Sequence, residues 1–170
     1  FVDPTSFAFK SVNALGILRP MPATQVTNDK VRSFVILENF WRALDSLGLC
    51  VFGFAPRGVM PLDTMVACIK AATGWEASLH DLMLAAERSS MLARAFNSRE
   101  GFTVKDDRLP SRLFEPKPNG PAAGTRIFSA EDFRAALDSY YAIIGCDPQT
   151  GRPAPGKLLE MNLEWVGALL

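Results

Sequence analysis

The sequence predicts an all-α fold, an irregular multihelical domain whose helices are joined by long loops rich in proline and glycine. Three observations lead to this prediction. Apolar residues recur at helical spacing in several segments. Helix-start residues and glycines stand where these segments should begin and end. No segment shows period-two alternation between hairpin turns, so we expect no sheet.

The chain starts with residues 1–28, which we interpret as an irregular lead-in segment because they hold three prolines and little periodicity. Residues 28–48 are expected to form the first helix, with Asn28 as its N-cap and Gly48 as the left-handed residue that ends it. The apolar band of this helix is wide, which indicates burial on most sides.

The remaining elements follow the same signals. Residues 51–58 read as a loop, and residues 61–74 as a helix with Pro61 in its first turn. A longer helix begins at Ser78 and Asp81, which resemble a capping box, and ends at Gly101. Residues 102–125 form a long ordered loop. Two more helices are expected, at 129–145 and as a single short helix within 154–170, separated by a turn.

The composition narrows the class of protein. The 170 residues fit one domain, and 18 basic residues balance 18 acidic ones, so net charge gives no sign of a nucleic-acid partner. No apolar run is long enough to span a membrane. Three distant cysteines favour a reducing, cytoplasmic compartment. The chain lacks an initiator Met and a signal peptide, and we expect it to be part of something longer.

Most candidate catalytic residues have a plain interpretation. His80 is the one histidine, and we interpret it as a surface residue of a helical first turn. The acid pairs Asp106–Asp107 and Glu131–Asp132 are interpreted as structural, because adjacent acids point in different directions and acids favour helix starts. The sequence has no phosphate-binding glycine loop and no spacing for a closed metal site.

The stretch "ALDSLGLC", residues 43–50, leaves two interpretations open. Cys50 after a helix is by composition alone a small buried apolar residue. Alternatively, Gly48 breaks the helix so that Asp45 and Cys50 face one ligand. A carboxylate accepts paired N–H donors, as on a pterin ring, and a thiolate binds soft metals and iron–sulfur clusters. One thiolate cannot hold a cluster, so further ligands would come from outside this chain.

Four motifs in order resemble the tungsten-containing aldehyde:ferredoxin oxidoreductase family, in its C-terminal portion. They are "DSLGLCVF", then "ATGW" followed by "AERSSMLARAFNSREGF", then "KDDRLPSRLFEP", and the ending "FRAALDSYYAIIGCDPQTGRPAPGKLLEMNL". The resemblance covers at least residues 30–163. It implies that all 170 residues form a C-terminal helical domain of a larger oxidoreductase chain.

The resemblance implies two shared cofactors, a [4Fe-4S] cluster and a tungsten (or molybdenum) bis-pterin. Cys50 matches the family's fourth cluster ligand, while the other three belong to an upstream Cys-x-x-Cys-x₃-Cys motif absent here. Asp45, Gly48 and the Leu49 backbone match the pterin-binding corner. The family's active-site Glu and His lie upstream, and His80 does not match that His. No catalytic residue is therefore expected in this fragment, which alone should be inactive.

The implied activity is oxidation of an aldehyde to a carboxylic acid, with electrons leaving to ferredoxin or another electron-transfer protein. The implied partners are the upstream domains of the same protein, and a homodimer is compatible with this interpretation. Two alternatives stay open: a relative that reduces aromatic acyl-CoA rings, and a helical interaction module that has lost its cofactor. Cys146, Ala86 and Ala154 depart from the family pattern, which leaves the substrate open. The motif residues Arg88, Asn97 and Arg99 have no assigned role.

Overall fold

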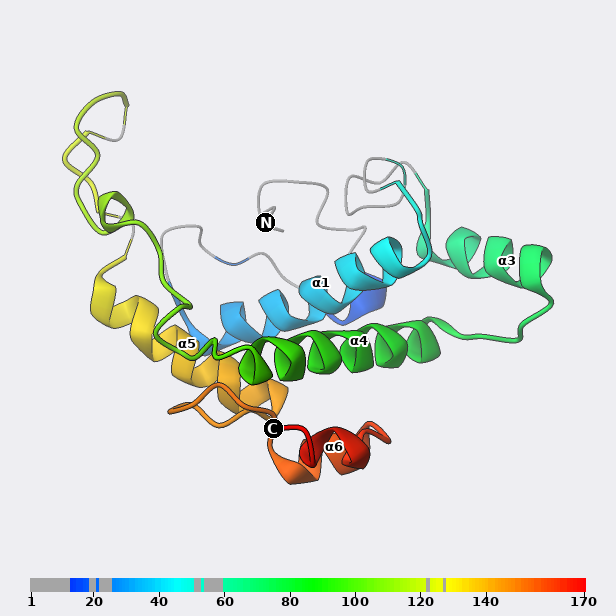
Figure 1. The fold of residues 1–170 in the computed structure, drawn as a ribbon. Coiled ribbons are helices and arrows are strands. Elements are labelled where there is room, and N and C mark those ends of the chain that lie inside the picture. The colour runs from blue at the N-terminus through cyan, green and yellow to red at the C-terminus, as the bar shows by residue number, and fades with distance from the viewer. Residues whose placement is uncertain are drawn as a thin grey trace. The chain divides into compact units, whose positions relative to one another are not determined.

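The computed structural model describes residues 13–18, 21, 26–50, 53, 60–121, 123–126 and 128–170. Within these ranges the chain is helical and contains no strand, which confirms the all-α prediction (Figure 1). An isolated bridge pairs Cys146 with Pro153. The elements are α1 (Asn28–Ser46), α3 (Leu62–Thr73), α4 (Leu79–Arg99), the 3₁₀ helix η2 (Ser111–Leu113), α5 (Ala130–Ile144), α6 (Pro155–Glu160) and α7 (Glu164–Gly167).

Most of the expected lead-in at residues 1–28 and most of the loop at residues 51–58 lie outside the described residues. The chain divides into two compact units. Unit 1 contains residues 1–23 and 33–90, and unit 2 contains residues 24–32 and 91–170.

The start of α1 differs from the expectation. Thr27, not Asn28, acts as the cap: its side-chain oxygen accepts from the Lys30 N–H at 3.3 Å, and its carbonyl accepts the Val31 N–H at 3.0 Å. The Asn28 side chain accepts instead from the Ser139 hydroxyl of α5, at 2.9 Å. The N-cap prediction for Asn28 was therefore wrong by one residue, because a tertiary contact takes up the Asn28 side chain.

The starts of α4 and α5 agree with the expected signals, and the start of α3 differs by one residue. Ser78 and Asp81 exchange hydrogen bonds across the first turn of α4, at 2.8 and 3.2 Å. Ser129 and Asp132 form the same capping box on α5, at 2.8 and 3.0 Å. Pro61 is the N-cap of α3 and not a residue of its first turn.

Left-handed glycines end α4 and α5 as expected. Gly101 and Gly145 both have positive φ, and each allows the next residue to donate its N–H back to the carbonyl five positions earlier. These bonds run from Phe102 to Asn97 at 3.0 Å and from Cys146 to Tyr141 at 2.8 Å. The pattern is the Schellman motif, which satisfies carbonyls that a helix end leaves unpaired.

The last predicted helix is in fact two. Asn162 adopts φ 53° and separates α6 from α7. The Leu163 N–H donates to the Leu158 carbonyl at 2.8 Å, and both leucine side chains are buried. The prediction of one helix was wrong because this exit uses asparagine, and asparagine is a weaker sequence signal for a helix end than glycine.

Unit 1 is held by an apolar core where three helices meet. Phe40 and Leu44 of α1 pack with Met65 and Ile69 of α3, and all four are buried. The partly buried residues around them include Leu82 of α4. Between Val31 and Leu44 of α1, Arg32 is the one exposed residue, and this burial agrees with the wide apolar band of the helix.

Unit 2 contains a long strap, residues 102–128, which extends from the N-terminal end of α5 (Figure 1). Apart from η2, its described residues form turns and irregular backbone, as expected of an ordered loop. The Phe114 ring lies 5.9 Å from that of Phe128 and 5.8 Å from that of Phe133. This aromatic cluster ties the middle of the strap to α5.

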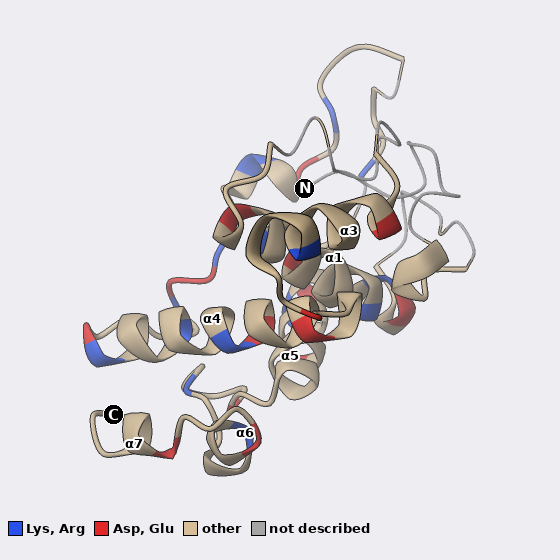
Figure 2. Cartoon of the chain, turned by 90° about the vertical axis from the view of Figure 1, so that its right-hand side faces the viewer, with Lys and Arg blue, Asp and Glu red and all other residues tan. Residues whose placement is uncertain are grey.

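Charge is mixed over the described helices, and acidic and basic residues are interspersed along α4 (Figure 2). This pattern fits the balance of 18 basic and 18 acidic residues in the whole chain. Among the described residues, no helix has both the length and the apolar character needed to cross a membrane.

The left-handed exit at Asn162 can be tested by substitution. Asn162→Val is expected to lower the free energy of unfolding by about 1–2 kcal/mol, because a β-branched residue tolerates positive φ poorly. Asn162→Gly should stay close to the parent, since glycine adopts this conformation freely. Denaturant unfolding of both variants provides the comparison. A valine variant as stable as the glycine variant would contradict the left-handed exit.

Candidate functional site

The predicted corner, residues 45–50, is a Schellman motif at the end of α1. Gly48 has φ 66°, and its N–H donates to the Asp45 carbonyl at 3.1 Å. The Leu49 N–H donates to the Leu44 carbonyl at 2.9 Å. These two bonds reverse the chain direction within a few residues, so Asp45 precedes the turn and Cys50 follows it.

Leu49 anchors this corner to the core of unit 1. Its side chain packs against the cluster that contains Phe40 and Leu44, which is the apolar contact expected of a Schellman motif. Its N–H is already used within the turn, so the Leu49 backbone offers its carbonyl oxygen, an acceptor, to a ligand. The corner is therefore fixed from inside by packing and backbone hydrogen bonds.

The polar groups of the corner are exposed. Asp45, Gly48 and Cys50 are all exposed, and a Cβ built on Gly48 would meet no atom within 4 Å. The interpretation of Cys50 as a buried apolar residue was therefore wrong. An accessible thiol, a carboxylate and an open backbone fit the donor set that a cluster edge and a pterin ring would use.

Cys50 is the only residue of this corner suited to a soft metal. Among the described residues, no three His, Cys, Asp or Glu side chains are grouped to hold a metal ion. Cys68 is exposed on α3, and Cys146 is buried after α5. Burial, partly opposed by Arg94 and Lys157, raises the pKa of the Cys146 thiol to about 11, so it stays protonated and is a poor metal ligand.

The remaining candidates agree with their plain interpretations. His80 is exposed in the first turn of α4. Asp106 accepts the Thr103 N–H at 2.8 Å within a turn, and Asp132 belongs to the capping box of α5. Of the motif residues without an assigned role, Arg88 is half-buried, whereas Asn97 and Arg99 are exposed.

A polar network that the sequence analysis missed joins three of the family-like motifs in unit 2. Arg94 of α4 donates to Asp107 of the strap at 2.6 Å and to the Gly151 carbonyl at 2.9 Å. The Tyr141 hydroxyl of α5 donates to the same Asp107 oxygen, and the Arg94 guanidinium lies 5.0 Å from the centroid of the Tyr141 ring. Arg94 is the first residue of "RAFN" in its family-like motif, so membership of this motif was the sequence signal that could have identified Arg94 as important.

The network shifts the pKa of each member. Burial alone would raise the pKa of Asp107, but the hydrogen bonds from Arg94 and Tyr141 outweigh it and lower that pKa. Burial together with the bond to Asp107 raises the pKa of Tyr141 to about 12. Asp107 is therefore a carboxylate and Tyr141 a neutral phenol near neutral pH. We interpret the network as a brace that fastens the strap and residues 147–153 to α4 and α5.

In the described part of the chain, helices and loops present the exposed Cys50 thiol at an acceptor corner, which fits a redox protein whose metal site is shared with other sequence. The family profile described as aldehyde ferredoxin oxidoreductase, domains 2 & 3, matches residues 3–163. The chain belongs to this family, as the four motifs predicted.

Curated relatives support this assignment. The tungsten-containing aldehyde ferredoxin oxidoreductase of Pyrococcus horikoshii is 31% identical over 156 residues, which cover 91% of this chain and 24% of that relative. The protein of the same description from Thermococcus kodakarensis is 31% identical over 155 residues, covering 90% and 24%. The chain thus spans about a quarter of the length of these relatives.

A solved structure shares the fold. It is the active-site complex BamBC of benzoyl-coenzyme A reductase in complex with 1,5-dienoyl-CoA. The similarity has a TM-score of 0.68 at 26% identity and covers 89% of this chain and 22% of that chain. Proteins similar to this chain are therefore named for two different reactions, that of an aldehyde ferredoxin oxidoreductase and that of a benzoyl-coenzyme A reductase.

The brace predicts a steric effect at Gly151. A Cβ there would lie 2.5 Å from Nη2 of Arg94, and the residue has φ 76°. Gly151→Ala is expected to destabilise the protein by about 1–3 kcal/mol, measured by denaturant unfolding. Gly156→Ala is the matched control, because that helical glycine has no atom within 4 Å of an added Cβ, and it should be neutral or up to about 1 kcal/mol more stable. Equal stability of the two variants would argue against the brace.

The lowered pKa of Asp107 predicts a pH dependence. Because the carboxyl has a lower pKa in the folded protein than in the unfolded chain, its contribution is present above about pH 4 and is lost as pH falls through the folded-state pKa. Asp107→Asn should cost about 1–2 kcal/mol near neutral pH, since the pair is partly exposed. Unfolding measured from about pH 7 to about pH 3 should show this difference shrinking. Asp138→Asn, which changes an exposed carboxylate of α5 outside the network, is the control for the loss of one negative charge.

Proposed function

We propose that this chain is the C-terminal part of a tungstopterin and iron–sulfur oxidoreductase that oxidises aldehydes to carboxylic acids and passes the electrons to ferredoxin. The observation that carries the proposal is the accessible corner of Asp45, Gly48, Leu49 and Cys50, built on a core-anchored Schellman motif within a chain of this family. The described relatives are tungsten-containing aldehyde ferredoxin oxidoreductases, which supports the choice of metal and substrate class.

In this proposal each residue of the corner has one role. The Cys50 thiolate is the single ligand that this chain gives to a [4Fe-4S] cluster, and the Asp45 carboxylate accepts N–H donors of a pterin ring. The Leu49 carbonyl is a second acceptor at the same turn. Gly48 leaves the space in which a ring can approach the backbone. When bound, the tungsten pterin supplies two-electron oxidation, and the cluster passes electrons on singly.

Asp45 and Cys50, the two cofactor contacts of this proposal, are five residues apart in sequence and flank one hydrogen-bonded turn. Electron transfer between redox groups needs a short path of fixed length, and a turn held by backbone hydrogen bonds provides fixed attachment points. The protein tunes a cluster by burial and by hydrogen bonds to its sulfurs. The catalytic Glu and His, and the other cluster ligands, would come from sequence outside these 170 residues.

A second candidate function is reduction of an aromatic acyl-CoA ring. It is favoured by the structural similarity to the benzoyl-coenzyme A reductase complex, at a TM-score of 0.68 and 26% identity. The same corner would serve either reaction, because it binds cofactors and not substrate. Assays of the natural protein with an aldehyde and with benzoyl-CoA, each with a suitable electron partner, would separate the two functions.

The assignment of Cys50 can be tested in the natural protein that carries this chain. Cys50→Ser is expected to lower the iron content by up to about four atoms per polypeptide, the content of one [4Fe-4S] cluster, or to shift the cluster's potential. The matched control is Cys68→Ser, which also changes an exposed thiol. Cys146→Ser controls for a buried one. Equal iron loss in all three variants would contradict the assignment of Cys50 as the cluster ligand.

The same preparations test Asp45 and the cofactor class. Asp45→Asn should lower the tungsten content and leave the iron content closer to normal, because the amide keeps the shape but loses the charged acceptor. Asp138→Asn should change neither metal. A natural protein that contains neither iron nor tungsten after anaerobic purification would instead support the third interpretation, an interaction module without a cofactor.

A further inference from the structure

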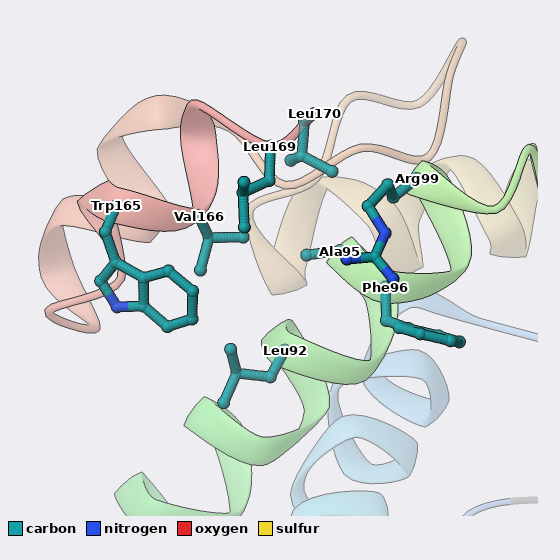
Figure 3. A pocket seen from close by; sticks show the side chains of 8 residues that line it. All are labelled: Leu92, Ala95, Phe96, Arg99, Trp165, Val166, Leu169 and Leu170. Carbon is teal, nitrogen blue, oxygen red and sulfur yellow. The ribbon is translucent and has the colours of Figure 1, made fainter.

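Unit 2 carries an apolar pocket of about 300 Å³ between the C-terminal half of α4 and the end of the chain. We call its lining the α4–α7 patch: Leu92, Ala95, Phe96, Arg99, Trp165, Val166, Leu169 and Leu170. In Figure 3, Trp165 and Val166 face Leu92 across the pocket, and Arg99 lies beside Phe96 on the far side. Neither the corner nor the brace uses any of these side chains.

The patch is unusually exposed for its composition. Trp165 is 60% exposed, Phe96 57% and Leu169 51%. Together these side chains present on the order of a few hundred Å² of apolar surface, the size at which such patches on soluble proteins commonly mark a binding surface. Aromatic residues at the centre of a concave apolar surface are typical anchors of protein interfaces.

The charge at the patch favours an apolar protein segment over a small polar ligand. Arg99 is the one charged residue in the lining, and its guanidinium already pairs with Glu100 at 2.9 Å and lies 5.1 Å from the centroid of the Phe96 ring. Small-molecule sites need a few well-placed polar groups to orient the ligand. In this lining the only charged side chain, Arg99, is already paired, and the indole N–H of Trp165 is the only other polar side-chain group, so the complementary surface is mainly apolar and carries no net charge.

We propose that the α4–α7 patch is covered by an apolar segment of the same polypeptide that lies outside these 170 residues, with one branched or aromatic side chain filling the pocket. The chain corresponds to 24% of its curated relatives and 22% of the solved chain that it resembles, so most of such a polypeptide lies elsewhere. The inference rests on the proposed function only in requiring that the natural protein have the length of these relatives.

Hydroxyl-radical footprinting of the natural protein, read by mass spectrometry, tests the proposal residue by residue. Trp165 and Phe96 are expected to be oxidised several-fold more slowly than in the unfolded chain at the same radical dose, because radical attack on a side chain falls with its exposed area. Exposures of 60% and 57% would instead give rates of roughly half those of the unfolded chain. Rates of that size would overturn the proposal.

A pair of variants controls for general loosening of the fold. Trp165→Asp places a charge in the pocket and should raise the oxidation rate of Phe96 towards its unfolded value. Leu159→Asp changes a residue of α6 that is 62% exposed and does not line the pocket, so it should leave Phe96 protected. If both variants expose Phe96 equally, or if neither does, the patch is not the docking surface.

Dilution identifies the occupant. Protection by a segment of the same polypeptide does not depend on protein concentration, whereas protection by a second copy is lost on dilution and would overturn the proposal. Iron and tungsten are measured on the same samples. If Trp165 is protected and neither metal is present, the proposed function is contradicted and the docking surface is supported. If Trp165 is exposed and both metals are present, the docking surface is contradicted and the proposed function is supported.

Discussion

Gly48 determines the geometry of the candidate site, because its positive φ lets the chain leave α1 and turn back within a few residues. A residue with a Cβ pays an energetic cost in this conformation, and a helix that continued would carry Cys50 onward along α1. The backbone bonds from Gly48 and Leu49 close the turn, and the Leu49 side chain fixes it to the core of unit 1. Because the residues between them are fixed, this turn sets the position of the exposed Asp45 relative to the exposed Cys50.

The same local chemistry explains which parts of the fold could be read from the sequence. The capping boxes at Ser78 and Ser129 and the glycine exits at Gly48, Gly101 and Gly145 involve only neighbouring residues, so sequence patterns identify them. Tertiary effects could not be read in this way. The Asn28 side chain is taken by Ser139, which leaves the capping to Thr27. The exit at Asn162 lacks the glycine that would have indicated it.

The candidate site could be predicted only in part from the sequence. Local signals gave the turn and left open whether Cys50 was buried, and the exposure of Cys50 decides that question. The pairing of Arg94 with Asp107 and Tyr141 was not predicted, because it joins residues from three motifs that are distant in sequence. Each motif was visible alone, but sequence spacing gives no sign of which members meet. The cofactor roles of Asp45 and Cys50 came from family resemblance and stand as proposals.

The anchoring of Leu49 has a consequence for how such a protein matures. The residue sits between the two proposed cofactor contacts, yet its side chain belongs to the apolar cluster that holds α1 and α3 together. A group that binds only the formed turn therefore stabilises that cluster by mass action, by RT ln(1 + [L]/Kd). Cofactor insertion and consolidation of unit 1 then become one linked equilibrium. A polypeptide awaiting its cofactors would be the more easily unfolded and proteolysed form, which gives a cell a physical basis for discarding it.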